Sequence, residues 1–259
     1  MPKIPDIRHG TALVTGASRG IGRVIALRLA ERGWAVAVNY RAARPEAEEV
    51  VAQIAQGGGN AIALQADVSL PEEAAALVHR AEEALGPLAV AVNNAGITRD
   101  RLLVQMSEED WETIWSTDLA GPRVLARLAA RSMAAAGGGS LVNIGSVVGV
   151  AGNAGQANYA AAKSALLGLT RELAVSCGVQ GVTVNCVVPG YIVTDATAHL
   201  NAQQRHQWQE RIPMRRFADP AEVADLVLFL CGRGGSYITG QCIAIDGGFL
   251  AAQGAGLDS

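Results

Sequence analysis

A tyrosine, a lysine and a serine are the first side chains whose types and spacing could do chemistry. Tyr159 and Lys163 stand four residues apart in a helical segment, so they share one helix face, and Ser146 follows an apolar, β-branched run. A phenol beside an ammonium can donate a proton to a carbonyl oxygen, because the positive charge lowers the phenol pKa, and a serine hydroxyl can hold the same oxygen. The trio predicts carbonyl reduction with Tyr159 as the proton donor.

The use of basic residues strengthens this interpretation of Lys163. Among the 21 lysines and arginines, only Lys3 and Lys163 are lysines. In a chain that uses arginine almost everywhere, a lysine at this point indicates that a compact ammonium is required rather than a guanidinium fork. The alternative is that Lys163 has a purely structural role.

A glycine-rich turn near the amino terminus predicts a cofactor site. The run Thr15-Gly16-Ala17-Ser18-Arg19-Gly20-Ile21-Gly22 lies between an apolar run and a helical segment. Glycines at such a place let the backbone turn tightly against a pyrophosphate, whose charge meets the helix N-terminus. Its position favours a dinucleotide, although a glycine-rich turn alone is also common in a chain with 30 glycines.

The residues after the second apolar run indicate which dinucleotide binds. Asn39-Tyr40-Arg41 stands about twenty residues beyond the turn, where a NAD site places an acid for the ribose hydroxyl, and no acid is there. Arg41, together with Arg19, suits a 2′-phosphate instead, so the sequence favours NADPH/NADP+. The alternative is that both arginines are solvated surface residues.

The alternation of apolar runs with helical segments predicts the scaffold that holds these side chains. Strands are expected over 12–15, 35–39, 61–65, 89–93, 141–144, 182–188 and 242–245, and helices over 20–32, 45–56, 71–85, 108–136, 157–177 and 220–231. Pro122 should bend or break the fourth helix near 119–122. The pattern is typical of α/β proteins and predicts one Rossmann-type doubly wound domain over 1–259, a seven-stranded parallel sheet flanked by helices. The polar segment 195–216 is predicted to be a substrate lid.

Open α/β sheets bind ligands at the carboxyl ends of their strands. Three more sequence runs follow predicted strands at that edge: Asp67-Val68, Asn93-Asn94-Ala95-Gly96 and Pro189-Gly190-Tyr191-Ile192-Val193-Thr194. The last should close around the nicotinamide, with Thr194 meeting the phosphates. The alternative is that each run is an ordinary strand-to-helix turn. The candidate cofactor-binding residues are Gly16, Ser18, Arg19, Gly20, Ile21, Gly22, Arg41, Asp67, Val68, Asn94, Ala95, Gly96, Tyr159, Lys163, Pro189, Gly190, Ile192 and Thr194.

Composition argues against several other classes of protein. The formal net charge is −3 without blocks of like charge, which argues against nucleic-acid and membrane-surface partners. No apolar signal segment occupies residues 1–18. The cysteines and histidines show no metal-ligand spacing, so we expect no metal site, and reduced, buried thiols in a cytoplasmic protein. They are Cys177, Cys186, Cys231, Cys242, His9, His79, His199 and His206.

Together these residues resemble the short-chain dehydrogenase/reductase family from Thr11 to about Phe249. The runs 93–100 (NNAGITRD), 145–149 (GSVVG), 155–163 (GQANYAAAK) and 237–240 (YITG) look most like the bacterial 3-oxoacyl-acyl-carrier-protein reductases. The resemblance implies an NADPH-dependent ketoreductase that converts a 3-oxoacyl thioester on acyl carrier protein to the 3-hydroxyacyl thioester in fatty-acid or polyketide synthesis. It also implies a homotetramer, catalysis by Ser146, Tyr159 and Lys163, and substrate contact by Ser146, Gln156 and Tyr159.

Two positions depart from the family pattern. The fourth catalytic position, an Asn in the family, is Asp118 here. A carboxylate near Lys163 would leave Tyr159 in a less positive field, so we expect an alkaline shift of the rate profile relative to Asp118→Asn. Of the two basic positions with which the family docks its acidic carrier, one is Arg131 but the other is Gln180. The residues that could substitute for it are Arg127, Arg211, Arg215 and Arg216, and the alternative is that each belongs to a solvated surface.

Two other functions stay open at this point. The chain could act on a free small-molecule carbonyl or alcohol rather than on a carrier-bound thioester. It could also be a non-catalytic NADP(H)-binding regulator, which Asp118 favours and the intact Ser146, Tyr159 and Lys163 set opposes.

Overall fold

Seven parallel strands run through the centre of the protein in the order β3-β2-β1-β4-β5-β6-β7. The structure, a computed structural model, describes residues 10–198 and 200–253. All seven predicted strands are present, with ends displaced by no more than two residues, and the predicted fold class is confirmed. The strands are β1 (Thr11–Val14), β2 (Ala35–Tyr40), β3 (Ala61–Gln65), β4 (Leu88–Asn93), β5 (Gly139–Ile144), β6 (Val182–Pro189) and β7 (Cys242–Ile245).

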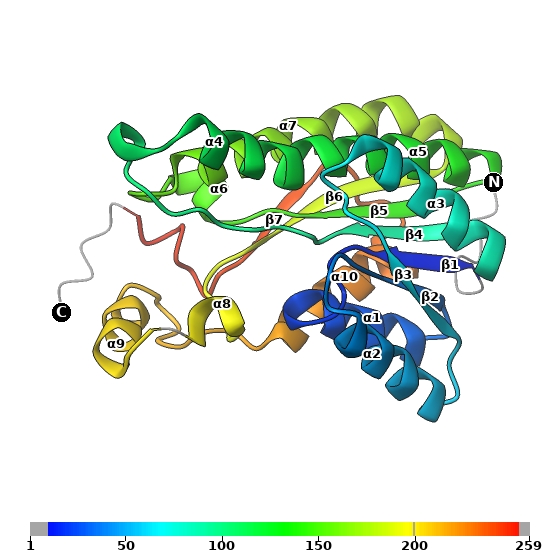
Figure 1. The fold of residues 1–259 in the computed structure, drawn as a ribbon, viewed down its shortest axis with the longest axis horizontal. Helices are drawn as coiled ribbons and strands as arrows, with labels where there is room; N and C mark the ends of the chain where they lie inside the picture. Colours follow the sequence, from blue (N-terminus) through cyan, green and yellow to red (C-terminus); the bar gives the residue numbers. More distant parts are fainter. Residues whose placement is uncertain (1–9, 199, 254–259) are drawn as a thin grey trace.

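Helices cover both faces of this sheet (Figure 1). One layer contains α3 (Pro71–Leu85), α4 (Glu108–Trp115), α5 (Gly121–Ala135) and α7 (Ala157–Cys177), and the other contains α1 (Gly20–Glu31), α2 (Arg44–Gln56) and α10 (Pro220–Cys231). Successive strand residues point to opposite faces, so Leu13 joins the core under the first layer while Val14 joins the core under the second. No helix in the described part of the chain is long and apolar enough to cross a bilayer.

The bend expected near Pro122 takes the form of a wide helical turn. A π-helical turn, η3 (Ser116–Ala120), connects α4 to α5, and Pro122 lies in the first turn of α5, where its missing N–H matters least. A Cβ on Gly121 would come within 2.0 Å of the Val68 carbonyl, so only glycine allows this close approach to the turn after β3. The same turn carries Asp118, which is fully buried.

The segment predicted to be a lid lies beyond the end of β6, outside the two helix layers (Figure 1). It contains α8 (Asp195–Ala198) and α9 (Ala202–Glu210), whose first turn is capped by Asn201. Trp208 and Ile212 of this segment pack in one apolar cluster with Tyr191, and the ring centroids of Tyr191 and Trp208 are 4.5 Å apart. Its function as a lid stays a prediction. The short helix α6 (Val148–Ala151) was not expected, because four residues show no period.

The cysteines are free thiols, but the prediction that all are buried is wrong for two of them. Cys186 and Cys231 are buried, whereas Cys177 and Cys242 are partly exposed. Cys177 ends α7 and Cys242 begins β7, an edge strand of the sheet, so neither is covered on all sides.

Two of the four histidines, His9 and His199, lie outside the described residues. In residues 10–198 and 200–253, no group of three or more His, Cys, Asp or Glu side chains could hold a metal ion.

Candidate active site

The structure brings Ser146, Tyr159 and Lys163 together at the carboxyl ends of β5 and β6. Tyr159 lies in the first turn of α7 and Lys163 one turn later, with its Nζ 5.5 Å from the centroid of the Tyr159 ring. The Ser146 hydroxyl, just after β5, hydrogen-bonds the Tyr159 phenol and lowers its pKa. Tyr159 is partly exposed, so the phenol can meet a ligand. The expected grouping of the three residues is present in one site.

A residue that the sequence did not single out holds the start of α7 in place. Asn158 is buried, and its amide donates to the Asp110 carbonyl at 3.1 Å and to the Arg99 carbonyl at 3.4 Å. Its Oδ1 accepts from the Tyr159 N–H at 2.8 Å. Nothing in its sequence position distinguishes this asparagine from a polar surface residue of α7.

Asp118 and Lys163 form a buried ion pair, so the carboxylate at position 118 does lie near Lys163. The distance from Lys163 Nζ to Asp118 Oδ2 is 3.2 Å, and their side chains are 4% and 0% exposed. Lys163 also donates to the Ile144 carbonyl at 3.0 Å, and Asp118 Oδ1 accepts from the Ile97 N–H at 3.0 Å. A Cβ on Gly96 would lie 2.8 Å from Asp118 Oδ2, so glycine lets the loop after β4 pass over this pair.

Burial and these charges set the protonation states. Burial raises the pKa of Tyr159, the Lys163 ammonium opposes this, and the Asp118 carboxylate raises the pKa further. Burial disfavours the Lys163 ammonium, but Asp118 and Tyr159 raise its pKa above the ordinary value. Burial also raises the pKa of Asp118, against the effects of Lys163 and the Ile97 hydrogen bond. Tyr159 is therefore protonated and Lys163 charged at neutral pH.

The glycine turn and the loop after β4 form one cradle. The Thr15 hydroxyl accepts from the Asn94 and Ala95 N–H groups at 3.0 Å each, and the Asn94 amide donates to the Thr15 carbonyl at 2.8 Å. Gly16 has φ +60, and a Cβ on Gly22 would lie 2.4 Å from Asn94 Nδ2. β1 and β4 are adjacent where the strand order reverses, which is where open α/β sheets bind ligands. Thr15 was quoted in the motif but its bridging role was not predicted.

The start of α1 is suited to an anion. Its N-cap, Arg19, makes no side-chain capping hydrogen bond, so first-turn N–H groups remain available. Ser18 is buried beside Arg19, and Ile21 is partly exposed. The loop after β6 reaches the same turn, because a Cβ on Gly20 would lie 3.8 Å from Thr194 Cγ2. The structure therefore brings these sequence-predicted residues to one place.

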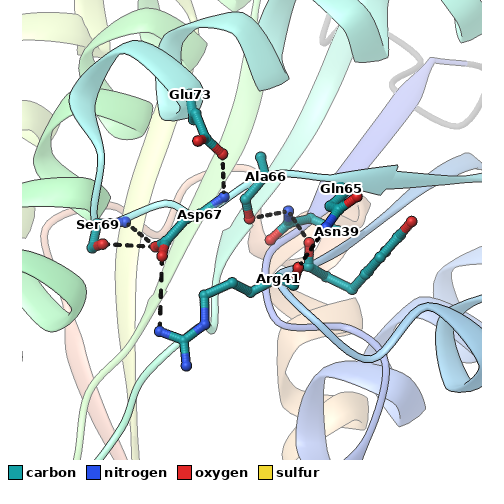
Figure 2. Close-up of polar contacts among 8 residues, drawn as sticks. Asn39, Arg41, Gln65, Ala66, Asp67, Ser69 and Glu73 are labelled. Carbon is teal, nitrogen blue, oxygen red and sulfur yellow. Dashed lines mark hydrogen bonds and ion pairs between the residues drawn. The ribbon is translucent and has the colours of Figure 1, made fainter.

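Figure 2 shows the other end of this cradle, where Arg41 extends from the end of β2 toward Asp67. The distance from Arg41 Nη1 to Asp67 Oδ2 is 3.8 Å, and the Arg41 side chain is 58% exposed. Ser69 holds Asp67 through its N–H at 3.0 Å and its hydroxyl at 2.7 Å. Asn39 links this end to the glycine turn by accepting from the Gly16 N–H at 3.2 Å. Arg41 and Arg19 thus present two guanidinium groups at the surface of the cradle, and the residues present fit a phosphorylated dinucleotide.

The remaining cofactor candidates lie at the same sheet edge. Val68 is buried and directs its carbonyl to Gly121. Pro189 ends β6, and Gly190 packs so closely on Asp246 that a Cβ would lie 2.9 Å from it. Ile192 is buried and bridges to Ala218.

Gln156, the predicted substrate contact, has both ends of its amide engaged. Its Nε2 donates to the two carboxylate oxygens of Asp100 at 3.0 Å each, and its Oε1 accepts from Asn153 at 2.9 Å. It lies three residues before Tyr159 as the N-cap of α7. A substrate would have to compete with Asp100 for the Nε2 group, so contact through Gln156 stays a prediction.

Arg131 does not lie beside the active site of its own chain. It follows Asp118 by 13 residues along the helix, which places it about 20 Å away along the axis. It lines a groove between α3 and α5 with His79, Glu82 and Leu128, next to the segment that leads into the amino end of β4. Gln180 precedes β6 at the same amino edge of the sheet.

Known proteins resemble more than nine-tenths of this chain. Residues 16–250 match the family model described as enoyl-(acyl carrier protein) reductase. The chain is 44% identical to the 3-oxoacyl-[acyl-carrier-protein] reductase of Staphylococcus aureus strain Mu50 over 92% of this chain and 97% of that protein. The corresponding enzyme of Synechocystis is 44% identical over 92% of this chain and 96% of that protein. That of Pseudomonas aeruginosa is 44% identical over 94% of this chain and 98% of that protein.

A solved structure, described as a candidate short-chain alcohol dehydrogenase from Sinorhizobium meliloti 1021, superposes with a TM-score of 0.90. It is 41% identical to this chain and covers 95% of this chain and 99% of its own. The resemblance drawn from the motifs is confirmed by these relatives, as is the prediction of an enzyme.

Proposed function

The chain belongs to the short-chain dehydrogenase/reductase family, and on that premise we propose that this oxidoreductase reduces the keto group of a 3-oxoacyl thioester on acyl carrier protein, with NADPH as the hydride donor. The observation that carries the reaction is the contact of one phenol, Tyr159, with a serine hydroxyl and a buried ammonium. The names of the relatives support the thioester and its carrier as substrate.

The cradle would hold the cofactor. The amino end of α1 and the close approach at Gly16 and Gly22 suit the pyrophosphate, and Arg41 with Arg19 suits the 2′-phosphate. The bound nicotinamide supplies a hydride to the carbonyl carbon. Thr194, which lies beside Gly20, would contact the phosphates.

Three side chains would complete the reduction. Tyr159 donates its hydroxyl proton to the carbonyl oxygen, and the Ser146 hydroxyl holds that oxygen. Lys163 stays charged because Asp118 favours its ammonium, and this charge stabilises the phenolate that Tyr159 becomes. Two hydroxyl groups meeting at one point suit a substrate oxygen, which favours a ketone over the carbon–carbon double bond named in the family model's description.

The decisive experiment follows NADPH oxidation with acetoacetyl-acyl carrier protein, free acetoacetyl thioesters, 2-enoyl thioesters and small free ketones. We expect turnover of both 3-oxoacyl substrates, with a several-fold higher kcat/KM for the carrier-bound form, because remote contacts add binding energy. Oxidation of NADPH by the 2-enoyl thioester alone would contradict the proposed reaction. Reduction of small ketones alone would favour the free-carbonyl reductase, which the solved structure's description supports. Binding of NADPH without any turnover would favour the regulator.

Arg41→Ala should reverse or erase the preference for NADPH. A charge-assisted hydrogen bond to a phosphate contributes about 1.5–3 kcal/mol, so the kcat/KM ratio of NADPH over NADH should fall about ten- to a hundredfold. Arg28→Ala is the matched control, because Arg28 pairs with Glu31 at the other end of α1 and should leave the ratio unchanged. A wild-type ratio below one, or an unchanged ratio in Arg41→Ala, would contradict the assignment of the 2′-phosphate to Arg41.

The partners and setting of the enzyme belong to the same proposal. A homotetramer, as the resemblance implies, would cover exposed apolar side chains such as Val175 of α7 and Val179 in the turn that follows it. Arg131, about 20 Å along the helix from Asp118, would serve as a docking residue only if the carrier spans that distance or reaches a neighbouring subunit. A cytoplasmic place in fatty-acid or polyketide synthesis completes the proposed function.

A further inference from the structure

Two cysteines outside the proposed catalytic machinery lie side by side on neighbouring strands. Cys186 of β6 and Cys242 of β7 are register partners in the parallel ladder. Paired residues of neighbouring strands lie about 5 Å apart and point to the same face of the sheet, within the Cα separation of about 4.4–6.8 Å that a disulfide spans. Both side chains belong to one apolar cluster with Val147 and Val188. A bond between the two sulfur atoms therefore needs no change of strand register.

The two thiols differ in reactivity. Cys242 is partly exposed and Cys186 is fully buried. The hydrogen bond with Cys186 lowers the pKa of Cys242 against the effect of burial, and the nearby Arg171 lowers it too. The same hydrogen bond, together with burial, raises the pKa of Cys186. Since the thiolate is the reactive form, Cys242 is the attacking sulfur and Cys186 the one that resolves it.

The other two cysteines lack this arrangement. Burial raises the pKa of Cys231 to about 12, so it is inert. Cys177 is partly exposed at the end of α7, where its sulfur lies 3.6 Å from the Ser176 hydroxyl. They serve as internal references for any thiol chemistry at the pair.

We propose that Cys242 and Cys186 form a thiol modification site that hydrogen peroxide converts reversibly to an intrachain disulfide. The Cys242 thiolate attacks one peroxide oxygen, the O–O bond breaks, and the departing hydroxide takes a proton to become water, leaving a sulfenic acid on Cys242. The Cys186 sulfur then attacks the Cys242 sulfur, the S–O bond breaks, and a second water leaves. Two thiols lose two electrons and two protons, and one peroxide becomes two waters. A dithiol reverses the reaction.

The position of Cys186 links this site to the reductase. A Cβ on Gly145 would lie 2.9 Å from Cys186 Sγ, so this sulfur supports the backbone immediately before Ser146. β6 also leads into Pro189 and Gly190, where its pairing with β7 ends at Pro189 and Ile245. Drawing the Cys186 sulfur toward β7 removes that support, so the disulfide form should turn over several-fold more slowly. This consequence rests on the proposed function, whereas the disulfide itself does not.

The test treats the full-length protein with hydrogen peroxide, alkylates remaining thiols, and analyses it by mass spectrometry without reductant. We expect the intact chain to lose the mass of two hydrogen atoms, with Cys186 and Cys242 recovered in one linked peptide and Cys177 and Cys231 still alkylated. Dithiothreitol should restore all four thiols. Cys177→Ser should behave as wild type, and Cys186→Ser should stop at a sulfenic acid on Cys242 that dimedone traps.

Three results would overturn the proposal. Full alkylation of Cys242 after peroxide treatment would show that it is not the reactive thiol. Links between two copies of the chain, or oxidation of Cys242 beyond the sulfenic acid while Cys186 stays free, would show that the pair does not close. Linked protein with unchanged NADPH turnover would overturn its connection to Ser146. If the chain is not a ketoreductase, the linked peptide should still form, so the two failures are distinguishable.

Discussion

Replacing Tyr159 with Phe is expected to lower kcat for reduction of a 3-oxoacyl thioester by about 10²- to 10⁴-fold, the usual contribution of a positioned general acid. The phenol is the group that Ser146 hydrogen-bonds and whose pKa the Lys163 charge lowers. Removing its hydroxyl leaves the ring, α7 and the buried Asp118–Lys163 pair in place. Affinity for NADPH should stay within a few-fold of wild type, because the cradle at Gly16 and Arg41 is untouched.

The measurements are single-turnover NADPH oxidation and a fluorescence titration of NADPH. Tyr237→Phe is the matched control, because Tyr237 lies fully exposed on the surface and should keep wild-type turnover. A Tyr159→Phe variant that retains most of its activity would exclude the phenol as the proton donor. A Tyr159→Phe variant that binds NADPH normally but has no turnover would show that the phenol acts in catalysis and not in cofactor binding. A non-catalytic regulator would show no turnover in the wild type either.

The sequence predicted the scaffold well because its signals are local. Each strand is a short apolar run, and Asp219 before Pro220 marks the start of α10 as a capped helix. The glycine turn and the spacing of Tyr159 and Lys163 are local in the same way. Local signals could not predict the contacts that join segments distant in the sequence. The bridge from Thr15 to Asn94 joins residues 79 apart in the sequence.

The neighbourhood of Cys186 and Cys242 illustrates the same limit. The absence of metal-ligand spacing predicted reduced thiols, but the same spacing does not show that Cys186 and Cys242 are neighbours, which follows from the register of β6 on β7. The π-helical turn is a second case. Pro122 indicated a bend or break in the helix, but the local sequence does not show the close packing of Gly121 on Val68 that accompanies the wider turn. Gln156 is a third case, since its engagement by Asp100 depends on a loop 56 residues earlier.

The buried position of Asp118 explains why a carboxylate here has consequences for rate. Asp118 is fully buried, its Oδ1 accepts from the Ile97 N–H, and its Oδ2 lies 3.2 Å from Lys163 Nζ. A charge in this setting is poorly screened, so it acts on Lys163 and through space on Tyr159. It favours the ammonium and disfavours the phenolate. With a neutral residue at position 118, Lys163 would leave a net positive field around Tyr159. The Asp118 charge partly cancels that field.

Asp118→Asn should therefore shift the pH dependence of both reaction directions to lower pH. The substitution removes a negative charge that raises the pKa of Tyr159, so that pKa falls. Reduction needs the protonated phenol and is lost as pH rises through the pKa of Tyr159, so its alkaline limb moves down. Oxidation of the 3-hydroxyacyl thioester needs the phenolate and rises through the same pKa, so it should be several-fold faster in the variant near neutral pH. The measurement is kcat/KM against pH in each direction.

Two features keep this test specific: a control substitution of a distant carboxylate, and the hydrogen bond from the Ile97 N–H that the variant can retain. Asp225→Asn removes the same charge from the outer face of α10, on the opposite side of the sheet from α7, and should leave both limbs where wild type has them. Asn at position 118 retains an Oδ1 that can accept from the Ile97 N–H, so the variant should fold, with melting temperature as the check. Equal pH profiles for wild type and Asp118→Asn would mean that the Asp118 charge is not felt at Tyr159. A shift of the two limbs in opposite directions would mean that a group other than the phenol controls them, since one pKa must move both together.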